Sequence, residues 1–395
     1  MSRVLVTDGE QRAALAVVRS LGRAGYEVIV AGPRSRTLAG ASRHAVAQHR
    51  LPDPLTRPAE FREALFALAL AERIDVLVPV AEPAVIAVLE AAQLPSGLRI
   101  PLPPLSVFRA ISDKQRLLET APTVGIRVPL QWTLANRAAV PDPALGALTF
   151  PVVIKPARSV AGAGESRAKL AVSYARDAEE LNRALAAYPD AAFPLLLQSR
   201  VDGPGVGIFL LRWEGVVRAV FAHRRIREKP PSGGVSVYRE SIPADPALVA
   251  CSTALLAAFD WSGVAMIEYK IEARTGTPYL MEVNGRFWGS LQLAVDAGVD
   301  FPRMLVELAL GGTPAKVYRY RSGLRLRWWL GDLDHLLARL RRPAGELALP
   351  ADAPTRLQTL LQVLRPWWPG DRSEILRLDD PLPALQELRD WLGRR

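Results

Sequence analysis

The chain has 395 residues, with 50 Lys or Arg against 40 Asp or Glu, so its formal charge is +10. At roughly 100–200 residues per domain, this length predicts two or three domains. A composition that is 49% hydrophobic and 23% charged excludes global disorder. The single cysteine, Cys251, excludes an internal disulfide and a Cys-rich zinc or iron–sulfur site.

The start of the chain shows no charged segment followed by an apolar one, and no apolar run of about 18 residues occurs. We therefore expect a cytoplasmic protein. Only six of the 50 basic residues are lysines, and the arginines are spread along the chain. Nucleic-acid binding needs clustered positive charge or a recognisable module, so we expect no nucleic-acid partner. Each lysine that is kept marks a place where a compact charge is needed.

The first part of the chain alternates between strands and helices. Strands are predicted at Arg3–Thr7, Glu27–Ala31 and Asp75–Val80, and helices at Arg12–Ala24, Glu60–Ala71 and Pro83–Ala92. Near-continuous apolar strands that alternate with helices are typical of a parallel, Rossmann-like sheet. The segment after the first strand reads TDGEQRAAL and lacks G-x-G-x-x-G, which disfavours a nicotinamide oxidoreductase.

A proline-rich linker at 98–106 separates this unit from a second one with a different pattern. One helix is predicted at Ser106–Ala121 and others at Ala178–Tyr188, Pro246–Ala258 and Pro302–Leu310. The predicted strands are Val128–Leu134, Val152–Lys155, Val172–Tyr174, Leu195–Val201, Val206–Trp213, Val216–His223, Gly263–Glu272 and Pro278–Asn284. The strands from 195 onward are expected to pair in antiparallel fashion, because short turn sequences join them.

The most informative segment is 263–290, GVAMIEYKIEARTGTPYLMEVNGRFWGS. A hairpin with its turn near Thr275 places Glu268 directly opposite Glu282, with Asn284 and Lys270 on the same face. Two carboxylates that face each other repel unless a positive group lies between them. Two carboxylates and an amide oxygen form an all-oxygen ligand set that suits Mg²⁺. Because Mg²⁺ completes its shell with substrate phosphates, the pattern points to a nucleotide.

Upstream segments fit the same interpretation. The apolar strand VVIKP ends in Lys155, and a lysine there is costly unless it meets an anion. A loop with Gly162 and Gly164 follows, whose backbone N–H groups can cover phosphates. The Walker pattern is absent, which excludes a P-loop NTPase. The strand LLLQSRV at 195–201 can pair its backbone with an adenine edge.

The order of these features resembles the ATP-grasp superfamily over about residues 3–312. Ser112–Lys114, VVIKP, Gln198–Val201 and E-x-N-x-R at 282–286 carry the resemblance, and HRRIREKPPSGG at 223–234 is similar to the carboxylate–amine ligases. The implied fold class is α/β and α+β multidomain. It has a Rossmann-like pre-ATP-grasp domain (1–105), a two-subdomain ATP-grasp domain (106–315; small part about 115–197, large part about 198–315) and a helical C-terminal region (316–395).

The resemblance implies an ATP-dependent ligase that joins a carboxylate to an amine through an acyl phosphate, with ATP and Mg²⁺, or Mn²⁺, as cofactors. The implied metal ligands are Glu268, Glu282 and Asn284, and the implied catalytic residues are Arg286 and Lys155. The implied nucleotide-binding residues are Lys114, Lys155, Gly162, Gly164, Gln198, Ser199 and Val201. Ser199 stands where the family often has an acidic residue, and Asp202 is the candidate for the ribose contact.

Several alternatives stay open. A carbamoyl-phosphate-synthase-like or carboxylase-like enzyme is one, although it would need partner chains, and a non-catalytic nucleotide-binding relative is another. Arg225 and Arg227 either grip the substrate or belong to a solvated strand end. The expected partners are a small-molecule carboxylate and amine, with a homo-oligomer possible. The Trp- and Arg-rich C-terminal region, with Trp328-Trp329 and Trp367-Trp368, fits either contact with a membrane surface or packing against the body of the protein.

Overall fold

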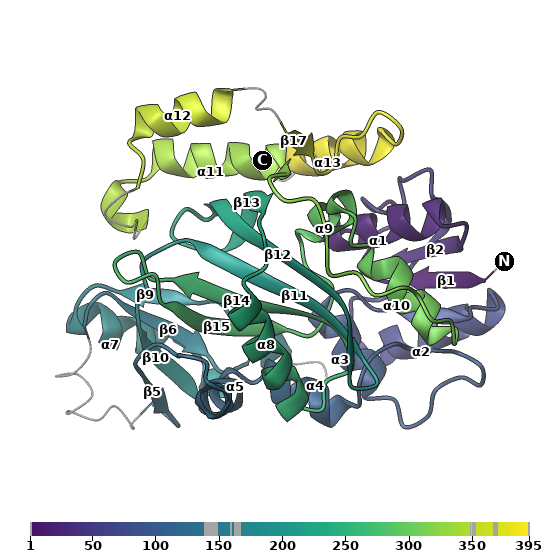
Figure 1. Cartoon of the computed structure of the whole chain (residues 1–395), viewed down its shortest axis with the longest axis horizontal. Helices are drawn as coiled ribbons and strands as arrows, with labels where there is room; N and C mark the ends of the chain where they lie inside the picture. The colour runs from purple at the N-terminus through teal and green to yellow at the C-terminus, as the bar shows by residue number, and fades with distance from the viewer. Residues whose placement is uncertain are drawn as a thin grey trace.

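The computed structural model describes residues 2–137, 149–158, 160–161, 167–347, 349, 353–365 and 370–393. These residues form three larger sheets and one two-stranded pair, with helices packed around them (Figure 1). The N-terminal sheet and the small sheet lie at opposite sides of the large central sheet, and three C-terminal helices lie across one end of the assembly.

The N-terminal sheet is parallel, with the order β3-β2-β1-β4, as the alternating pattern predicts. Its strands are β1 (Arg3–Val6), β2 (Glu27–Gly32), β3 (Ala45–Arg50) and β4 (Val76–Val78). Its helices are α1 (Arg12–Arg23), α2 (Pro58–Ala71) and α3 (Glu82–Leu89). Strand β3 was missed because AVAQHR is polar and largely solvent-facing, with no apolar alternation to mark it.

The single helix expected at Ser106–Ala121 is wrong, because the chain breaks at Asp113. Helix α4 (Leu105–Ser112) ends there and α5 (Lys114–Thr120) begins. Asp113 has extended backbone angles, and its carboxylate accepts hydrogen bonds from the N–H groups of Gln115 and Arg116. An aspartate in this position is a strong helix N-cap, and the chain changes direction there, so that Lys114 is the first residue of a new helix.

The small sheet is antiparallel, with the order β5-β10-β6-β9. Its strands are β5 (Gln131–Leu134), β6 (Val152–Pro156), β9 (Ser173–Ala175) and β10 (Leu195–Ser199), and α7 (Ala178–Ala187) covers it, with Asp177 as its N-cap. A short pair, β7 (Val160–Ala161) and β8 (Ala168–Lys169), stands beside it. Lys155 in β6 lies opposite Leu196 in β10. The pairing of these two strands therefore places Lys155 next to the segment 195–201, which is predicted to pair with adenine.

The large sheet has seven strands in the order β15-β14-β11-β12-β13-β16-β17. They are β11 (Gly205–Trp213), β12 (Val216–Lys229), β13 (Val235–Ser241), β14 (Gly263–Ile271), β15 (Pro278–Asn284), β16 (Arg325–Arg327) and β17 (Asp371–Ser373). The helices α8 (Pro246–Ala258), α9 (Leu291–Ala297) and α10 (Phe301–Ala309) pack around it. One apolar core joins this sheet to β1 and α1, and a second lies on α4, α5 and α8.

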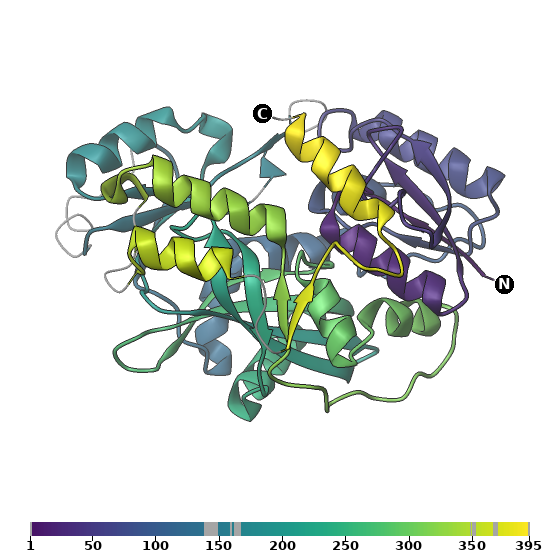
Figure 2. The same cartoon turned by 90° about the horizontal axis from the view of Figure 1, so that it is seen from above.

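The C-terminal region is not wholly helical. Helices α11 (Trp329–Arg341), α12 (Arg356–Leu364) and α13 (Leu382–Leu392) are present, but β16 and β17 add two strands to the large sheet. Figure 2 shows α11 and α12 above the sheet and α13 beside α1. No helix in the described ranges is long and apolar enough to cross a membrane. The division into three domains stays a prediction.

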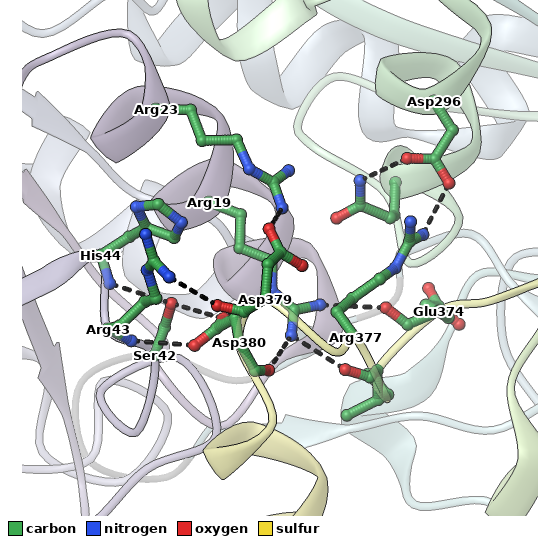
Figure 3. A network of polar contacts seen from close by, with 12 residues as sticks. Arg19, Arg23, Ser42, Arg43, His44, Asp296, Glu374, Arg377, Asp379 and Asp380 are labelled. Carbon is green, nitrogen blue, oxygen red and sulfur yellow. Dashed lines mark hydrogen bonds and ion pairs between the residues drawn. The ribbon is translucent and has the colours of Figure 1, made fainter.

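A polar network fastens this C-terminal segment to the N-terminal unit (Figure 3). Arg19 of α1 is 1% exposed and forms a 2.8 Å ion pair with Asp380, and it also donates to the carbonyls of Glu374 and Ile375. Asp380 accepts further hydrogen bonds from the Ser42 hydroxyl and the Arg43 N–H. Charges buried this deeply persist only when they are paired, so the network ties together segments more than 300 positions apart in the chain.

Trp328 and Trp329 each stack against an arginine side chain of the protein. The guanidinium of Arg12 lies 3.8 Å from the Trp328 ring centre and that of Arg327 lies 3.8 Å from the Trp329 ring centre. Trp328 also donates its indole N–H to Glu387. These contacts favour packing against the body of the protein over membrane contact for this pair. Trp367 and Trp368 lie outside the described residues.

Candidate active site

The hairpin of β14 and β15 brings the predicted metal ligands together. Glu268 lies directly opposite Glu282 in the ladder, which confirms the predicted register. Asn284 lies two pairs further along, opposite Met266, and its side-chain N–H donates to Glu282 at 2.9 Å. Arg286 follows the strand and donates to the Asn284 amide oxygen at 3.1 Å. Residues at this spacing on a strand share one face, so four polar groups line a single row.

Two lysines from different elements approach this row. Lys114, buried at the start of α5, has its Nζ 3.9 Å from a carboxylate oxygen of Glu282. Lys155, from β6, donates to the side-chain oxygen of Gln198 at 2.7 Å. Gln198 in turn donates to Gln131 at 3.1 Å, which fixes its amide with the oxygen toward the lysine. The break at Asp113 and the strand β6 thus point two cations toward one pair of carboxylates.

The burial of these groups shifts their protonation. Burial lowers the pKa of Lys155 to about 8, although Glu282 and Glu268 oppose the shift. Burial raises the pKa of Glu268 to about 7, against the pull of Arg225. Burial also acts on Glu282, but Lys114 and the hydrogen bond from Asn284 outweigh it and hold the pKa of that carboxyl below its ordinary value. Perturbed groups of opposite charge that gather in one place are typical of a functional site.

The donor set fits a hard divalent ion. No group of three or more His, Cys, Asp or Glu side chains with metal-site spacing occurs among the described residues, so a protein-only cage is absent there. Two carboxylates and one amide oxygen form an incomplete oxygen shell of the kind that Mg²⁺ completes with water and phosphate. The amide of Asn284 donates its N–H to Glu282, and its oxygen accepts a hydrogen bond from Arg286.

Arg225 and Arg227, the two predicted substrate residues, have different surroundings. Arg225 forms ion pairs with Glu268 and, at 2.8 Å, with Glu228. Arg227 forms a two-pronged pair with Asp332 of α11 at 2.7 and 2.6 Å. Arg225 thus contacts Glu268, one of the two facing carboxylates of the row, whereas Arg227 attaches strand β12 to helix α11. Neither side chain belongs to a solvated strand end.

A small pocket beside the row contains residues that the sequence did not single out. Glu82, Ser112 and Phe108 line it together with Lys114, Glu282, Asn284 and Arg286. Glu82 begins α3 four residues after Val78 ends β4, on the side of the carboxyl end of that parallel strand. Ligand sites in such sheets lie at this edge, so the position of Glu82 after the predicted strand was a usable signal. Ser199 ends β10, with Val201 two residues on, while Gly162 and Gly164 lie outside the described residues.

Known proteins resemble the chain in two ways. A family model described as "ATP-grasp in the biosynthetic pathway with Ter operon" matches residues 192–331. A formate-dependent phosphoribosylglycinamide formyltransferase from Mycobacteroides abscessus is 30% identical over 167 residues. That match covers 40% of this chain and 40% of the relative, so it spans well under half of either protein.

Solved structures match over a longer stretch. An L-amino acid ligase from Bacillus licheniformis superposes with a TM-score of 0.61 at 18% identity, over 78% of this chain and 74% of that one. An N5-carboxyaminoimidazole ribonucleotide synthetase from Thermotoga maritima superposes with a TM-score of 0.55 at 18% identity, over 81% of this chain and 78% of that one. A biotin carboxylase from Campylobacter jejuni superposes with a TM-score of 0.63 at 15% identity, over 82% of this chain and 74% of that one.

These likenesses show that the fold, a parallel N-terminal sheet followed by a small antiparallel sheet and a large one, is shared over about four fifths of the chain. The match over the hairpin and its neighbouring strands is more specific. Residues 192–331 of the chain thus match an ATP-grasp family model.

Proposed function

We propose that the protein is an ATP-dependent ligase that joins a carboxylic acid to an amine. The observation that carries this proposal is the pairing of Glu268 with Glu282 across one hairpin, with Lys114 and Lys155 aimed at the same place. Facing carboxylates are stable only around positive charge, and nearby lysines add the charge that a triphosphate needs.

The proposed reaction has two steps. A carboxylate oxygen of the acid attacks the γ-phosphorus of ATP, the bond to the β-phosphate oxygen breaks, and ADP leaves. The amine nitrogen then attacks the carbonyl carbon of the acyl phosphate, inorganic phosphate leaves, and the nitrogen loses a proton to give the amide. Phosphoryl transfer of this kind depends mainly on positioning and on neutralising charge.

The residues of the site have matching proposed roles. Glu268, Glu282 and Asn284 hold Mg²⁺, or Mn²⁺ in its place, and the ion when bound neutralises charge on the phosphate oxygens. Lys155 and Lys114 bind phosphate oxygens, and Arg286 orients the transferring phosphoryl group. The backbone of Gln198, Ser199 and Val201 is proposed to meet adenine, and the loop with Gly162 and Gly164 to cover the phosphates.

The relatives support this choice of chemistry. The neighbour from Bacillus licheniformis is an L-amino acid ligase, and the relative from Mycobacteroides abscessus is a formate-dependent formyltransferase. The names of both proteins therefore refer to a carboxylic acid. Another neighbour was solved in complex with Mg-ADP and bicarbonate, which supports the proposed cofactors. We also propose that the protein is cytoplasmic, as expected from its sequence.

The test is ADP release in the presence of Mg-ATP, measured against a panel of carboxylic acids and amines that includes bicarbonate. Lys155→Ala and Glu282→Ala are each expected to abolish acid-dependent ADP release while circular dichroism shows an intact fold. Lys316→Ala and Glu179→Ala, which alter exposed residues outside the site, are the matched controls and are expected to keep it. Full turnover in both site variants would refute the proposal.

A further inference from the structure

A second, larger cavity lies between the large sheet and the C-terminal helices. Its volume is about 310 Å³, which is within the range of small-molecule sites. One wall is the segment from Arg200 to Gly205 together with β12 and β14, and the opposite wall comes from α11, α12 and the described residues Leu349, Ala353 and Pro354. The described polar and charged residues that line it are Arg200, Asp202, Arg225, Arg227, Glu228, Ser232, Lys270, His335, Arg339, Thr359 and Gln362.

Cations outnumber acids in this lining, although Arg200, Arg225 and Arg227 are each paired with a carboxylate. Five of the described lining residues are cationic and two are acidic. Lys270 donates to the carbonyl of Gly203 at 3.2 Å, and Arg339 donates to the carbonyl of Pro354. A carbonyl satisfies a hydrogen bond but does not neutralise a charge, so these two contacts leave positive potential on both walls. A cavity of this kind favours an anionic ligand.

The cavity adjoins the carboxylate row through Arg225. This side chain lines the cavity, and its guanidinium forms an ion pair with Glu268. An anion at this end of the cavity is therefore next to a proposed ligand of Mg²⁺. Asp202, the candidate for the ribose contact, lies on the same side of the cavity. The cavity is thus adjacent to the proposed nucleotide site and separate from the pocket of Lys114 and Arg286.

The wall made by α11 is fixed in place by three contacts with β12. Arg227 pairs with Asp332, Lys229 pairs with Asp334, and the His335 Nδ1 lies 2.6 Å from the carbonyl of Glu228. Burial lowers the pKa of His335, so the ring is neutral near pH 7 and its Nδ1–H donates to that carbonyl. The C-terminal region therefore builds part of a pre-formed cavity.

We propose that this cavity binds the carboxylic acid substrate, and that the substrate carries a second anionic group. The second anion lies between Lys270 and Arg339, whose printed partners are carbonyls, and the reacting carboxylate lies at the opposite end of the cavity, toward Glu268. Gln362, which is exposed to the cavity from α12, contributes to selection at the far end. This inference rests on the proposed function and adds the substrate class, a dicarboxylate or an equivalent dianion, and a role for the C-terminal helices.

The first part of the test compares probes on the wild-type protein. Glutarate and succinate are assayed against butyrate and propionate for stimulation of ADP release with Mg-ATP, and for protection against thermal unfolding without nucleotide. We expect the dicarboxylates to stimulate release at lower concentration and to raise the Tm, and the monocarboxylates to do neither. Equal behaviour of the two sets would overturn the proposal.

The second part changes one charge at the far wall. Gln362→Glu is nearly isosteric, and Gln362→Lys also places a flexible polar side chain at this exposed position, so both variants are expected to fold. The Glu variant should raise the KM for glutarate about fivefold and the Lys variant should lower it, with the KM for ATP unchanged. Gln93→Glu, the same change at an exposed position away from the cavity, is the matched control.

The outcomes separate this inference from the proposed function. If the Gln362 variants shift the KM for ATP instead of that for glutarate, the cavity belongs to the nucleotide and the substrate proposal is wrong. If no acid stimulates ADP release but glutarate still raises the Tm in a manner that depends on the charge at 362, the proposed ligase function fails while the dianion site stands.

Discussion

The binding of Mg-nucleotide should depend on pH with two limbs, because two of the proposed contacts titrate near neutrality. Burial lowers the pKa of Lys155 to about 8 and raises that of Glu268 to about 7. Phosphate binding needs the charged lysine and metal binding needs the ionised carboxylate. Affinity should therefore rise from pH 6 to 7, be greatest between 7 and 8, and fall above 8.

The magnitude of the alkaline limb follows from the pKa of Lys155. With a pKa of about 8, roughly nine-tenths of the lysine is charged at pH 7 and roughly one-tenth at pH 9. If the charge is required, the Kd of Mg-ADP should increase about tenfold between these two values. A lysine with the ordinary pKa of 10.5 would give almost no change over the same interval.

Isothermal titration calorimetry with Mg-ADP at half-unit steps from pH 6 to 9.5 measures this profile. Lys155→Arg keeps a charge at all of these pH values, so it should lose the alkaline limb even if its affinity is lower. Glu268→Gln should lose the acidic limb. A Kd for the wild-type protein that is flat from pH 7 to 9.5 would refute the assignment of Lys155 to the phosphates.

Three further results are expected. Asp380→Asn should reduce the free energy of unfolding by about 3–5 kcal/mol in urea titrations, since it leaves Arg19 buried without its charge partner; Asp379→Asn, at a half-exposed pair, should cost less than about 1 kcal/mol, and equal losses would contradict the account of the buried network. Gly207→Ala should lower the Tm, because a Cβ there would lie 2.6 Å from the Phe209 ring, and an unchanged Tm would show that the ring gives way freely. EDTA should abolish ADP release and added Mg²⁺ should restore it, and release that persists in EDTA would remove the metal from the proposal.

Much of the site was accessible from sequence because its signals are local. The short turn near Thr275 and the alternation of the strands predict the partner of Glu268, and a register shift between Glu268 and Tyr269 completes the pairing with Glu282 in the structure. The N-terminal sheet was equally visible in its apolar strands. In both cases the residues that determine the structure lie within a few positions of each other in the chain.

The parts that were missed depend on contacts distant in the chain. Strand β16 is RLR and strand β17 is DRS, sequences with no strand pattern of their own. They join the sheet because Arg325 pairs with Glu240 at 3.1 Å and Glu374, next to β17, pairs with Arg12 and Arg239 at 2.6 Å. Such partners are not visible in a single sequence, which is also why the second cavity was not predicted.

The central claim is that Glu268, Glu282 and Asn284 bind a divalent ion together with a nucleotide. The most direct test is calorimetry of ADP binding with and without Mg²⁺, on the wild-type protein and on Glu282→Gln. We predict that Mg²⁺ tightens binding of ADP to the wild-type protein by at least about tenfold and has little effect on the variant, because a required oxygen ligand has lost its charge. Binding to the wild-type protein that is the same with and without Mg²⁺ would contradict the claim.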